Sequence, residues 1–414
     1  MSYTLNVVTL NCWAIPFPYP FGSTARTRRI QAIAQTLLDS NYDVVSLQEL
    51  WSEKDFHYIT TFLKEIFPFA HYFHSGFTGS GTCVISKFRI VSTLKHNYSL
   101  NGFAHHIHRG DWFGGKLIGM VEIMVGRMKV AIYTTHLHAE YNRHNDPYLP
   151  HRLIQAYEVG QFVRYTSQGA DLAIVTGDFN IEPQDLAYKV VTDVADLKDA
   201  WVVKPNVMEI SGMTCDRPDN CFTNLKLKQD NPLGKRLDYI FFKEGSSAVK
   251  LIFCDNTFDV IPGSKMNYSD HLGVYARFTL QQSADRTFNF NTILSVDENM
   301  MEEALAILDQ GQLRAQYDKK LFAVISSLLG IALITSFFFN FWEFKILVNL
   351  VRLVLTLVLG FSVWHWLIIL TIEIKGLKES RSSFKEVLKK SPSSINDSIH
   401  STQSTRSSER MVSD

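Results

Sequence analysis

Two long apolar runs near the C-terminus constrain this chain most strongly. Residues 321–341 contain no charged side chain, and residues 353–372 are interrupted only by His365. A helix needs about 20 apolar residues to cross a bilayer, so both runs are long enough. The link between the runs, WEFK, is too short for anything but a hairpin. We therefore predict transmembrane helices at 321–341 and 346–372, in preference to a pair of buried core helices.

Basic residues flank both ends of this predicted hairpin. They are Lys319, Lys320, Lys375, Lys378, Arg381 and Lys385. The positive-inside rule places this side in the cytosol, and the N-terminus has no basic segment followed by a long apolar one, as a secretory signal would. The expected topology is a multi-pass membrane protein whose catalytic domain and C-terminus are cytosolic. The membrane is expected to be that of the endoplasmic reticulum, the Golgi or the cell surface (the plasma membrane), since both spans fit each of these bilayers.

The remaining chain divides by composition into three further parts. Residues 1–284 read as a globular domain, 285–320 as an amphipathic juxtamembrane helix, and the tail 373–414, which is rich in Ser and Lys, as disordered. Lys plus Arg equals Asp plus Glu at 41 each, so no net field favours a nucleic-acid partner. The five cysteines are scattered and form no Cys-x-x-Cys pair, so a disulfide framework or structural zinc site is not indicated.

Strand and helix patterns interleave through residues 1–284. Strands are predicted at 43–50, 130–138 and 170–180, and helices at 26–39 and 148–166. Such alternation favours an α/β or layered α+β enzyme domain.

Polar side chains recur where these predicted strands end. The set comprises Asn11, Glu49, His136, His138, Asp178, Asn180, Asp238, Asp270 and His271. Any one of them could stabilise a turn, but a polar group attached to an apolar strand costs free energy unless partners are supplied. Because ligand sites gather where strand ends meet loops, we expect these side chains to converge.

The residue types in this set suit metal-assisted cleavage of a phosphodiester. Glu49 offers hard oxygen ligands, Asn11 is neutral, and no thiolate is nearby, which favours Mg²⁺ or Mn²⁺ over zinc. Two imidazoles can act as acid and base, each oriented by a carboxylate. Asp178 and Asn180, two apart on a chain taken as extended, are expected to point the same way.

Several motifs carry a family resemblance. They are LNCW, LQELW, SGTCVISKFRI, THLHAEYNR, TGDFN, RLDYIFF and YSDHLGV. Their order resembles that of the endonuclease/exonuclease/phosphatase superfamily over residues 3–280. The resemblance implies an α+β fold, a four-layer α/β/β/α sandwich of deoxyribonuclease I type, followed here by the two-helix transmembrane hairpin. Within the superfamily, NCWAIP, LNGFAHHIHRGDWFGGK and HLHAEYNRHNDPYLPHR are similar to membrane-anchored eukaryotic neutral sphingomyelinases.

The resemblance also implies roles for the predicted site residues. Glu49 would be the principal Mg²⁺ ligand with Asn11 beside it, Mn²⁺ being able to substitute. His271 would be the general base that Asp238 orients, and His136 would face the leaving group and protonate the ceramide oxygen directly or through metal-bound water. Asp178 would position the attacking water, Asn180 would donate to a phosphate oxygen, and Asp270 would complete the polar shell, as a second metal ligand in one variant.

Three further residues are candidates for contact with the substrate: His138, Lys116 and Trp112. A structural role for His138 is equally compatible with the sequence. Trp112 and Phe113 lie among glycines, and this loop is either an ordinary aromatic turn or one that dips into lipid or covers choline.

The function expected from the resemblance is hydrolysis of sphingomyelin to ceramide and phosphocholine, with membrane phospholipid as partner and no nucleic acid. A lysophospholipase C acting on lyso-platelet-activating factor or lysophosphatidylcholine remains open, because sphingomyelin resides largely in the leaflet opposite a cytosolic site. A nuclease or inositol-phosphate phosphatase is disfavoured by the balanced charge and the two spans. An inactive lipid-binding scaffold is disfavoured by the complete catalytic set.

Overall fold

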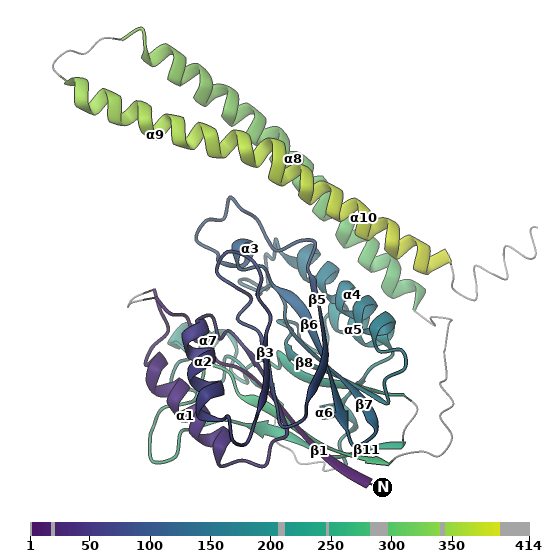
Figure 1. Ribbon diagram of the computed structural model, residues 1–414. Coiled ribbons are helices and arrows are strands. Elements are labelled where there is room, and N and C mark those ends of the chain that lie inside the picture. Colours follow the sequence, from purple (N-terminus) through teal and green to yellow (C-terminus); the bar gives the residue numbers. More distant parts are fainter. Residues whose placement is uncertain are drawn as a thin grey trace, which may run out of the picture. The chain divides into compact units, whose positions relative to one another are not determined.

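A computed structural model shows the fold (Figure 1) and describes residues 2–17, 21–205, 212–245, 248–281, 297–339 and 344–389. The chain divides into two compact units. The first comprises Met1–Asn101 and Gly110–Leu294, and the second comprises Gly102–Arg109 and Ser295–Asp414. Predictions that fall on residues 282–296, 340–343 and 390–414, including most of the predicted tail, lie outside the described residues.

The first sheet of the first unit has the strand order β11-β12-β1-β2-β4-β3. The strand bounds are β1 Ser2–Asn11, β2 Val44–Gln48, β3 Phe69–Tyr72, β4 Cys83–Ser86, β11 Ala248–Thr257 and β12 Gly273–Gln281. Strands β1 and β2 are parallel, whereas β4 runs antiparallel to β2.

The second sheet has the strand order β5-β6-β7-β8-β10-β9. The strand bounds are β5 Ile90–Asn97, β6 Leu117–Val125, β7 Met128–His136, β8 Leu172–Asp178, β9 Lys198–Asp199 and β10 Asp238–Glu244. Strands β7 and β8 are parallel, and β10 is antiparallel to β8.

Alternating apolar side chains build two buried layers from these strands. In β1, Val7 belongs to the core between the sheets, while its neighbour Val8 belongs to the core beneath α1 (Arg26–Leu38) and α2 (Glu53–Phe62). Both faces of β1 are thus covered, which explains its nearly continuous apolar run.

Two helices cover the outer face of the second sheet: α4 (Leu149–Thr166) and α5 (Leu186–Ala195). The Phe162 ring of α4 meets Tyr133 of β7 edge-on at 6.0 Å, and Tyr188 of α5 lies 5.8 Å from Phe241 of β10. Three short helices occupy loops: α3 (Asp111–Gly114), α6 (Ala200–Val203) and α7 (Leu225–Asp230). The unit is an α/β/β/α sandwich, which confirms the predicted fold class (Figure 1).

The second unit contains two long apolar helical segments. The first is α8 (Glu298–Ser336), and the second is α9 (Lys345–Trp364), continued by a π-helical turn η2 (His365–Ile369) and α10 (Leu370–Lys389). Both segments are long and apolar enough to cross a membrane. The predicted juxtamembrane helix and first span are a single helix here, and helix continues to Lys389 where the sequence predicts a tail from 373.

Polar contacts hold the two segments antiparallel. Ser326 Oγ lies 2.8 Å from Ser362 Oγ, and Lys319 Nζ donates to Thr371 Oγ1 at 2.6 Å. At the turn of the hairpin, Arg352 Nη2 donates to the Ser336 carbonyl at 2.6 Å, satisfying one of the carbonyls left free where α8 ends.

A short segment from the middle of the chain, Gly102–Arg109, belongs to this second unit. Its Phe103 ring lies 4.8 Å from the Arg314 guanidinium of α8, and His105 Nδ1 lies 3.0 Å from His365 Nε2. The sequence did not predict this pairing, because hydrophobic periodicity does not show which distant segments pack together.

Candidate active site

The polar residues converge because parallel strands end at the same edge of a sheet. In the first sheet, Asn11 at the end of β1 pairs with Gln48 at the end of β2, so that Glu49 is the next residue. In the second sheet, His136, Asp178 and Asp238 lie side by side in register on β7, β8 and β10. The two edges together therefore place these five residues at one end of the sandwich.

The backbone at this end is held in unusual conformations. Glu49 and Asn180 are not glycine, yet they have φ of 54° and 50° in the left-handed region. Backbone strain of this kind occurs preferentially at functional sites. At Gly177, with φ of 142°, an added Cβ would lie 2.0 Å from the Thr135 carbonyl oxygen, so only glycine permits β7 and β8 to approach so closely.

The prediction that Asp178 and Asn180 lie on an extended chain is wrong. Asp178 Oδ1 accepts a hydrogen bond from the Asn180 backbone N–H at 2.9 Å, which closes a tight turn directly after β8. The turn sends Asn180 Nδ2 to the Leu137 carbonyl at 3.0 Å. An amide nitrogen carries two hydrogens, so the second one is available to a ligand.

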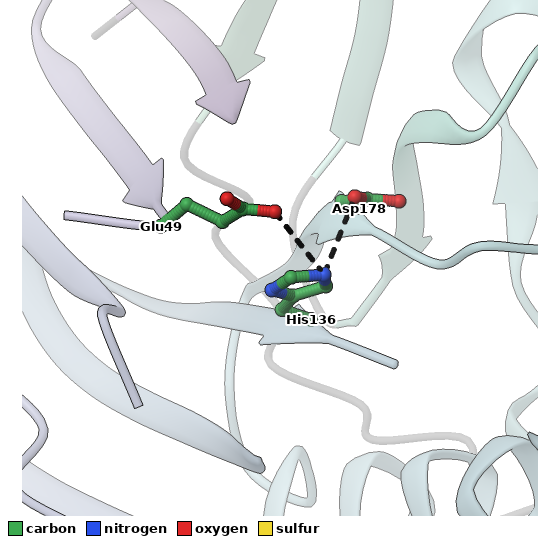
Figure 2. Close-up of side chains that lie close together, drawn as sticks. All are labelled: Glu49, His136 and Asp178. Carbon is green, nitrogen blue, oxygen red and sulfur yellow. Dashed lines mark ion pairs between the residues drawn. The ribbon is translucent and has the colours of Figure 1, made fainter. Parts of the chain in front are cut away.

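Glu49, His136 and Asp178 form the centre of the site (Figure 2). His136 Nε2 lies 3.4 Å from Asp178 Oδ2 and 3.9 Å from Glu49 Oε1. Asn11 Nδ2 donates to Glu49 Oε1 at 3.0 Å and to Asp178 Oδ2 at 2.9 Å, while its Oδ1 accepts from the Trp13 backbone N–H. In this orientation Asn11 holds the two carboxylates in place through its amide hydrogens.

His271 and Asp238 form a second, directly hydrogen-bonded pair. His271 Nδ1 lies 2.8 Å from Asp238 Oδ2, which leaves Nε2 facing Asp178 at 3.9 Å. Burial lowers the pKa of His271, but Cys215, Asp238 and Asp178 outweigh it, so that the pKa is raised well above its ordinary value. Among the described residues, Asp238 Oδ1 is buried with no hydrogen-bond partner.

Two further carboxyl groups are perturbed by the same crowding. Burial and the neighbouring Asp238 raise the pKa of Asp178. Burial also raises the pKa of Asp270 to about 6, with Glu49 adding to the effect. Carboxylates gathered in a low-dielectric site favour any cation that neutralises them.

Lys116 lies at the centre of a buried polar cluster beside His136. Its ammonium donates to the Leu137 carbonyl at 2.6 Å and lies 2.6 Å from Asp111 Oδ1 and 3.0 Å from His136 Nε2. Burial and the Lys116 charge together lower the pKa of His136 well below its usual value. The lowered pKa favours the neutral imidazole, the form in which histidine binds metals.

The other predicted substrate contacts are placed differently. His138 is fully buried and stacks on Tyr148 with ring centroids 4.1 Å apart, so its surroundings favour the structural role. Trp112 is half-buried, and its ring meets that of Phe113 edge-on with the centroids 5.0 Å apart. Asp270, which is predicted to complete the polar shell, accepts a hydrogen bond from Ser269 Oγ at 3.1 Å.

Sequence reasoning missed Arg29, which with Arg152 is among the largest fully buried side chains of the described residues. Its guanidinium donates to the carbonyls of Cys12 at 2.7 Å, Trp13 at 2.6 Å and Tyr268 at 3.1 Å. It thus ties the loop that follows Asn11 to the loop that leads to His271. An arginine followed by an isoleucine at the start of an amphipathic helix gives no sign of this role.

Replacing Arg29 by leucine is expected to destabilise the first unit by about 3 kcal/mol, because four carbonyls, those of Cys12, Trp13, Thr24 and Tyr268, lose a charged donor. The measurement is the thermal midpoint of the full chain in detergent. Arg28→Leu, at an exposed position of the same helix, is the matched control and should change the midpoint little. Equal midpoints for the two variants would show that these hydrogen bonds contribute nothing net.

The site residues fit a divalent cation. One ligand atom from each of Glu49, His136 and Asp178 can be chosen so that all lie within 4.8 Å of one another, and the same holds for Asp178, Asp238 and His271. Two carboxylates with one neutral imidazole form an oxygen-rich set of the kind that Mg²⁺ and Mn²⁺ accept.

Comparison with known proteins gives a consistent family assignment. Residues 8–271 match the model of the Endonuclease/Exonuclease/phosphatase family. The chain is 46% identical over 398 residues to a protein of Caenorhabditis elegans named putative neutral sphingomyelinase, with 93% of this chain and 91% of the relative covered. It is 36% identical over 285 residues to human sphingomyelin phosphodiesterase 2, with 68% and 66% covered.

Among solved structures, sphingomyelinase C from Streptomyces griseocarneus has the same fold. The TM-score is 0.50 at 17% identity, with 66% of this chain and 99% of that chain covered. With the match to the worm relative extending over nearly the whole chain, the present chain belongs to the Endonuclease/Exonuclease/phosphatase family and, within it, to the neutral sphingomyelinase group.

Proposed function

We propose that the protein hydrolyses sphingomyelin by a phospholipase C-type reaction that depends on Mg²⁺ and releases ceramide and phosphocholine. One observation carries the chemistry: donor atoms of Glu49, His136 and Asp178 lie within 4.8 Å of one another, beside a His271–Asp238 pair at 2.8 Å. The substrate class comes from the relatives, whose names are putative neutral sphingomyelinase and sphingomyelin phosphodiesterase 2.

In this proposal His271 is the general base. Its Nδ1 donates to Asp238, which fixes the tautomer that leaves Nε2 free to take a proton. The base removes a proton from the attacking water, the new P–O bond forms, and the bond from phosphorus to the ceramide oxygen breaks. The raised pKa of His271 makes it a stronger base and keeps the proton it has taken.

His136 is assigned to the leaving-group side of the reaction. Asp178 Oδ2 lies between the two imidazoles, 3.4 Å from His136 Nε2 and 3.9 Å from His271 Nε2. Because burial and Lys116 lower its pKa, His136 would act on this side as a neutral ligand of the cation, and the proton that the ceramide oxygen receives would come from water. Lys116, 3.0 Å from His136 Nε2, brings positive charge to the side where the ceramide oxygen becomes negative.

Glu49, Asp178 and His136 would hold the divalent cation, and Asn11 would keep the two carboxylates in position. When bound, the ion supplies positive charge that neutralises the phosphate and stabilises the leaving oxygen. The second N–H of Asn180 Nδ2 is free to donate to a non-bridging phosphate oxygen.

We further propose that α8 and the α9–α10 segment form a transmembrane hairpin with both ends in the cytosol. Their length and apolar composition support this topology, as do the lysines and arginines at the open end. The hairpin would keep the catalytic unit at the lipid surface where its substrate resides.

Replacing Asp238 by asparagine is expected to shift the acid limb of the kcat profile to lower pH. The activity of a base appears as pH rises through its pKa, and Asp238 is one of the groups that raise the pKa of His271. Asparagine can also donate to Nδ1 and place the remaining imidazole proton on Nε2, so the plateau should fall by about 10²-fold. The measurement is kcat against pH between mildly acidic and alkaline conditions; an unmoved limb would remove Asp238 from this role.

The direct test of the proposed function uses the purified full chain in mixed micelles with Mg²⁺. Release of phosphocholine and ceramide from sphingomyelin is expected, with less turnover of lyso-platelet-activating factor and lysophosphatidylcholine in the same micelles. Faster turnover of either lysolipid would assign the enzyme to lysophospholipids. Absence of turnover on all three lipids with Mg²⁺ or Mn²⁺ would reject the proposal.

A further inference from the structure

Three exposed phenylalanines lie on loops next to the strands that carry the candidate site. Phe77 is 91% exposed, Phe21 78% and Phe17 58%, and the values for Phe77 and Phe21 are among the highest of any large apolar side chain described. Exposed apolar side chains of this size on a soluble surface mark an interaction site when they are grouped.

Sheet topology anchors the two loops that carry these residues on either side of the strand that leads to Glu49. Strand β2 ends at Gln48, directly before Glu49, and lies between β1 and β4. On one side, the Ala14 N–H of the loop that follows β1 donates a hydrogen bond to the Glu49 carbonyl at 3.0 Å. The loop that enters β4 bonds on the other side, through Leu50 N–H to the Gly81 carbonyl at 2.9 Å. Phe17 and Phe21 are on the first loop, and Phe77 is on the second.

Backbone contacts fix the conformation of the turn that carries Phe77. The Phe77 N–H donates to the Phe113 carbonyl at 2.8 Å, which ties the turn to the loop of Asp111 and Lys116. Gly76, with φ of 56°, approaches so closely that an added Cβ would lie 2.4 Å from the Gly114 carbonyl oxygen. The Phe77 side chain is thus presented outward by a backbone with little freedom to turn it inward.

The first loop is also closed at its base, since the Ser23 N–H donates to the Ile15 carbonyl at 3.2 Å. Neither loop contains a charged residue: residues 14–24 read AIPFPYPFGST and residues 75–82 read SGFTGSGT. Within these residues a partner recognised by charge, whether an acidic protein or an anionic lipid, would find no complementary group, and His74 at the start of the second loop faces Glu53 at 3.3 Å.

We propose that Phe17, Phe21 and Phe77 form an apolar rim that enters the interface of a zwitterionic bilayer and docks the catalytic unit on it. This inference rests on the proposed function, because a lipid substrate requires the site to face the membrane. The neutral loops and aromatic tips fit phosphocholine headgroups and the upper acyl chains. Docking through the rim would bring the site closer to the bilayer. The scissile phosphate would then have a shorter distance to move out of the bilayer before it reaches Glu49 and Asp178.

The test separates docking from chemistry by the physical state of the substrate. The full chain is reconstituted in phosphatidylcholine nanodiscs that contain sphingomyelin, and separately assayed in detergent on a short-chain, monomeric sphingomyelin. The triple variant Phe17→Ser, Phe21→Ser, Phe77→Ser is expected to lose about tenfold in nanodisc turnover, because three inserted rings are lost. Turnover of the monomeric substrate should change less than about twofold. Phe77→Trp should keep nanodisc turnover, since tryptophan suits the interface.

The matched control is Tyr165→Ser, which removes a 64% exposed aromatic ring from α4. It should leave both turnovers unchanged, and the nanodisc turnover of the wild type should not depend on NaCl concentration because the rim is uncharged. Equal losses on both substrates would show that these phenylalanines support the fold or the active site rather than docking. Unchanged turnover in nanodiscs would show that they do not dock the unit on the bilayer.

A measurement that needs no turnover distinguishes failure of the rim from failure of the proposed function. A fluorophore attached to Phe77→Cys in a Cys221→Ser background should be quenched by spin-labelled lipids in the nanodisc, and one at Tyr165→Cys should not. Quenching without sphingomyelin hydrolysis would reject the proposed substrate and keep the docking surface. Equal quenching at both positions would reject the docking surface.

Discussion

Replacement of His271 by glutamine should lower kcat on monomeric sphingomyelin by about 10³-fold. The imidazole is the group whose Nε2 faces the centre of the site while its Nδ1 is held by Asp238 at 2.8 Å. Glutamine fills a similar volume and can hydrogen-bond to Asp238, but its amide cannot take a proton from water near neutral pH. The loss should therefore appear in kcat with little change in KM.

A matched histidine elsewhere provides the control for this prediction. His57 lies exposed on α2, so His57→Gln should retain full activity. Thermal melting of both variants with Mg²⁺ verifies that the divalent site and the fold persist. If His271→Gln keeps more than about a tenth of the wild-type kcat, another group is the base.

Replacement of Glu49 by glutamine should abolish both turnover and the stabilisation that Mg²⁺ confers. Glu49 supplies one of the two carboxylates in the central cluster and receives an N–H from Asn11 at 3.0 Å. Saturation of a site at one hundred times its Kd stabilises a protein by about 2.7 kcal/mol. The wild type should therefore melt several degrees higher with Mg²⁺ than without it, whereas Glu49→Gln should melt at one temperature, with kcat lowered by about 10³-fold.

The control here is Glu53→Gln, which changes an exposed carboxylate four residues further along the chain. That variant should keep the thermal shift with Mg²⁺. A persisting shift in Glu49→Gln would mean that the ion is held by the second cluster, Asp178, Asp238 and His271, and would reassign the metal site.

Much of the sandwich could be predicted because its elements have strong local patterns. Helix α1 occupies Arg26–Leu38 where residues 26–39 show helical periodicity, and α4 occupies Leu149–Thr166 where a proline marks a helix start. The convergence of Glu49, His136 and Asp178 was also predictable, since strand ends meet at sheet edges. Their roles in the reaction remain predictions.

Features that depend on contacts between distant residues could not be predicted. Arg29 reaches Tyr268 across 239 positions, and no local pattern records that contact. Lys116 looked like a candidate for substrate contact, yet its ammonium is enclosed by Asp111, the Leu137 carbonyl and His136. The turn at Asp178 was missed because a side chain, rather than the next strand, accepts the Asn180 N–H.

Glu49 is held at φ of 54°, a conformation that glycine adopts freely and glutamate does not. A Glu49→Gly variant should therefore have a higher thermal midpoint than the wild type when no divalent ion is present, and it should lack activity. Selection for thermostability alone would tend to discard this glutamate, so screens for hardier forms of such enzymes need an activity filter.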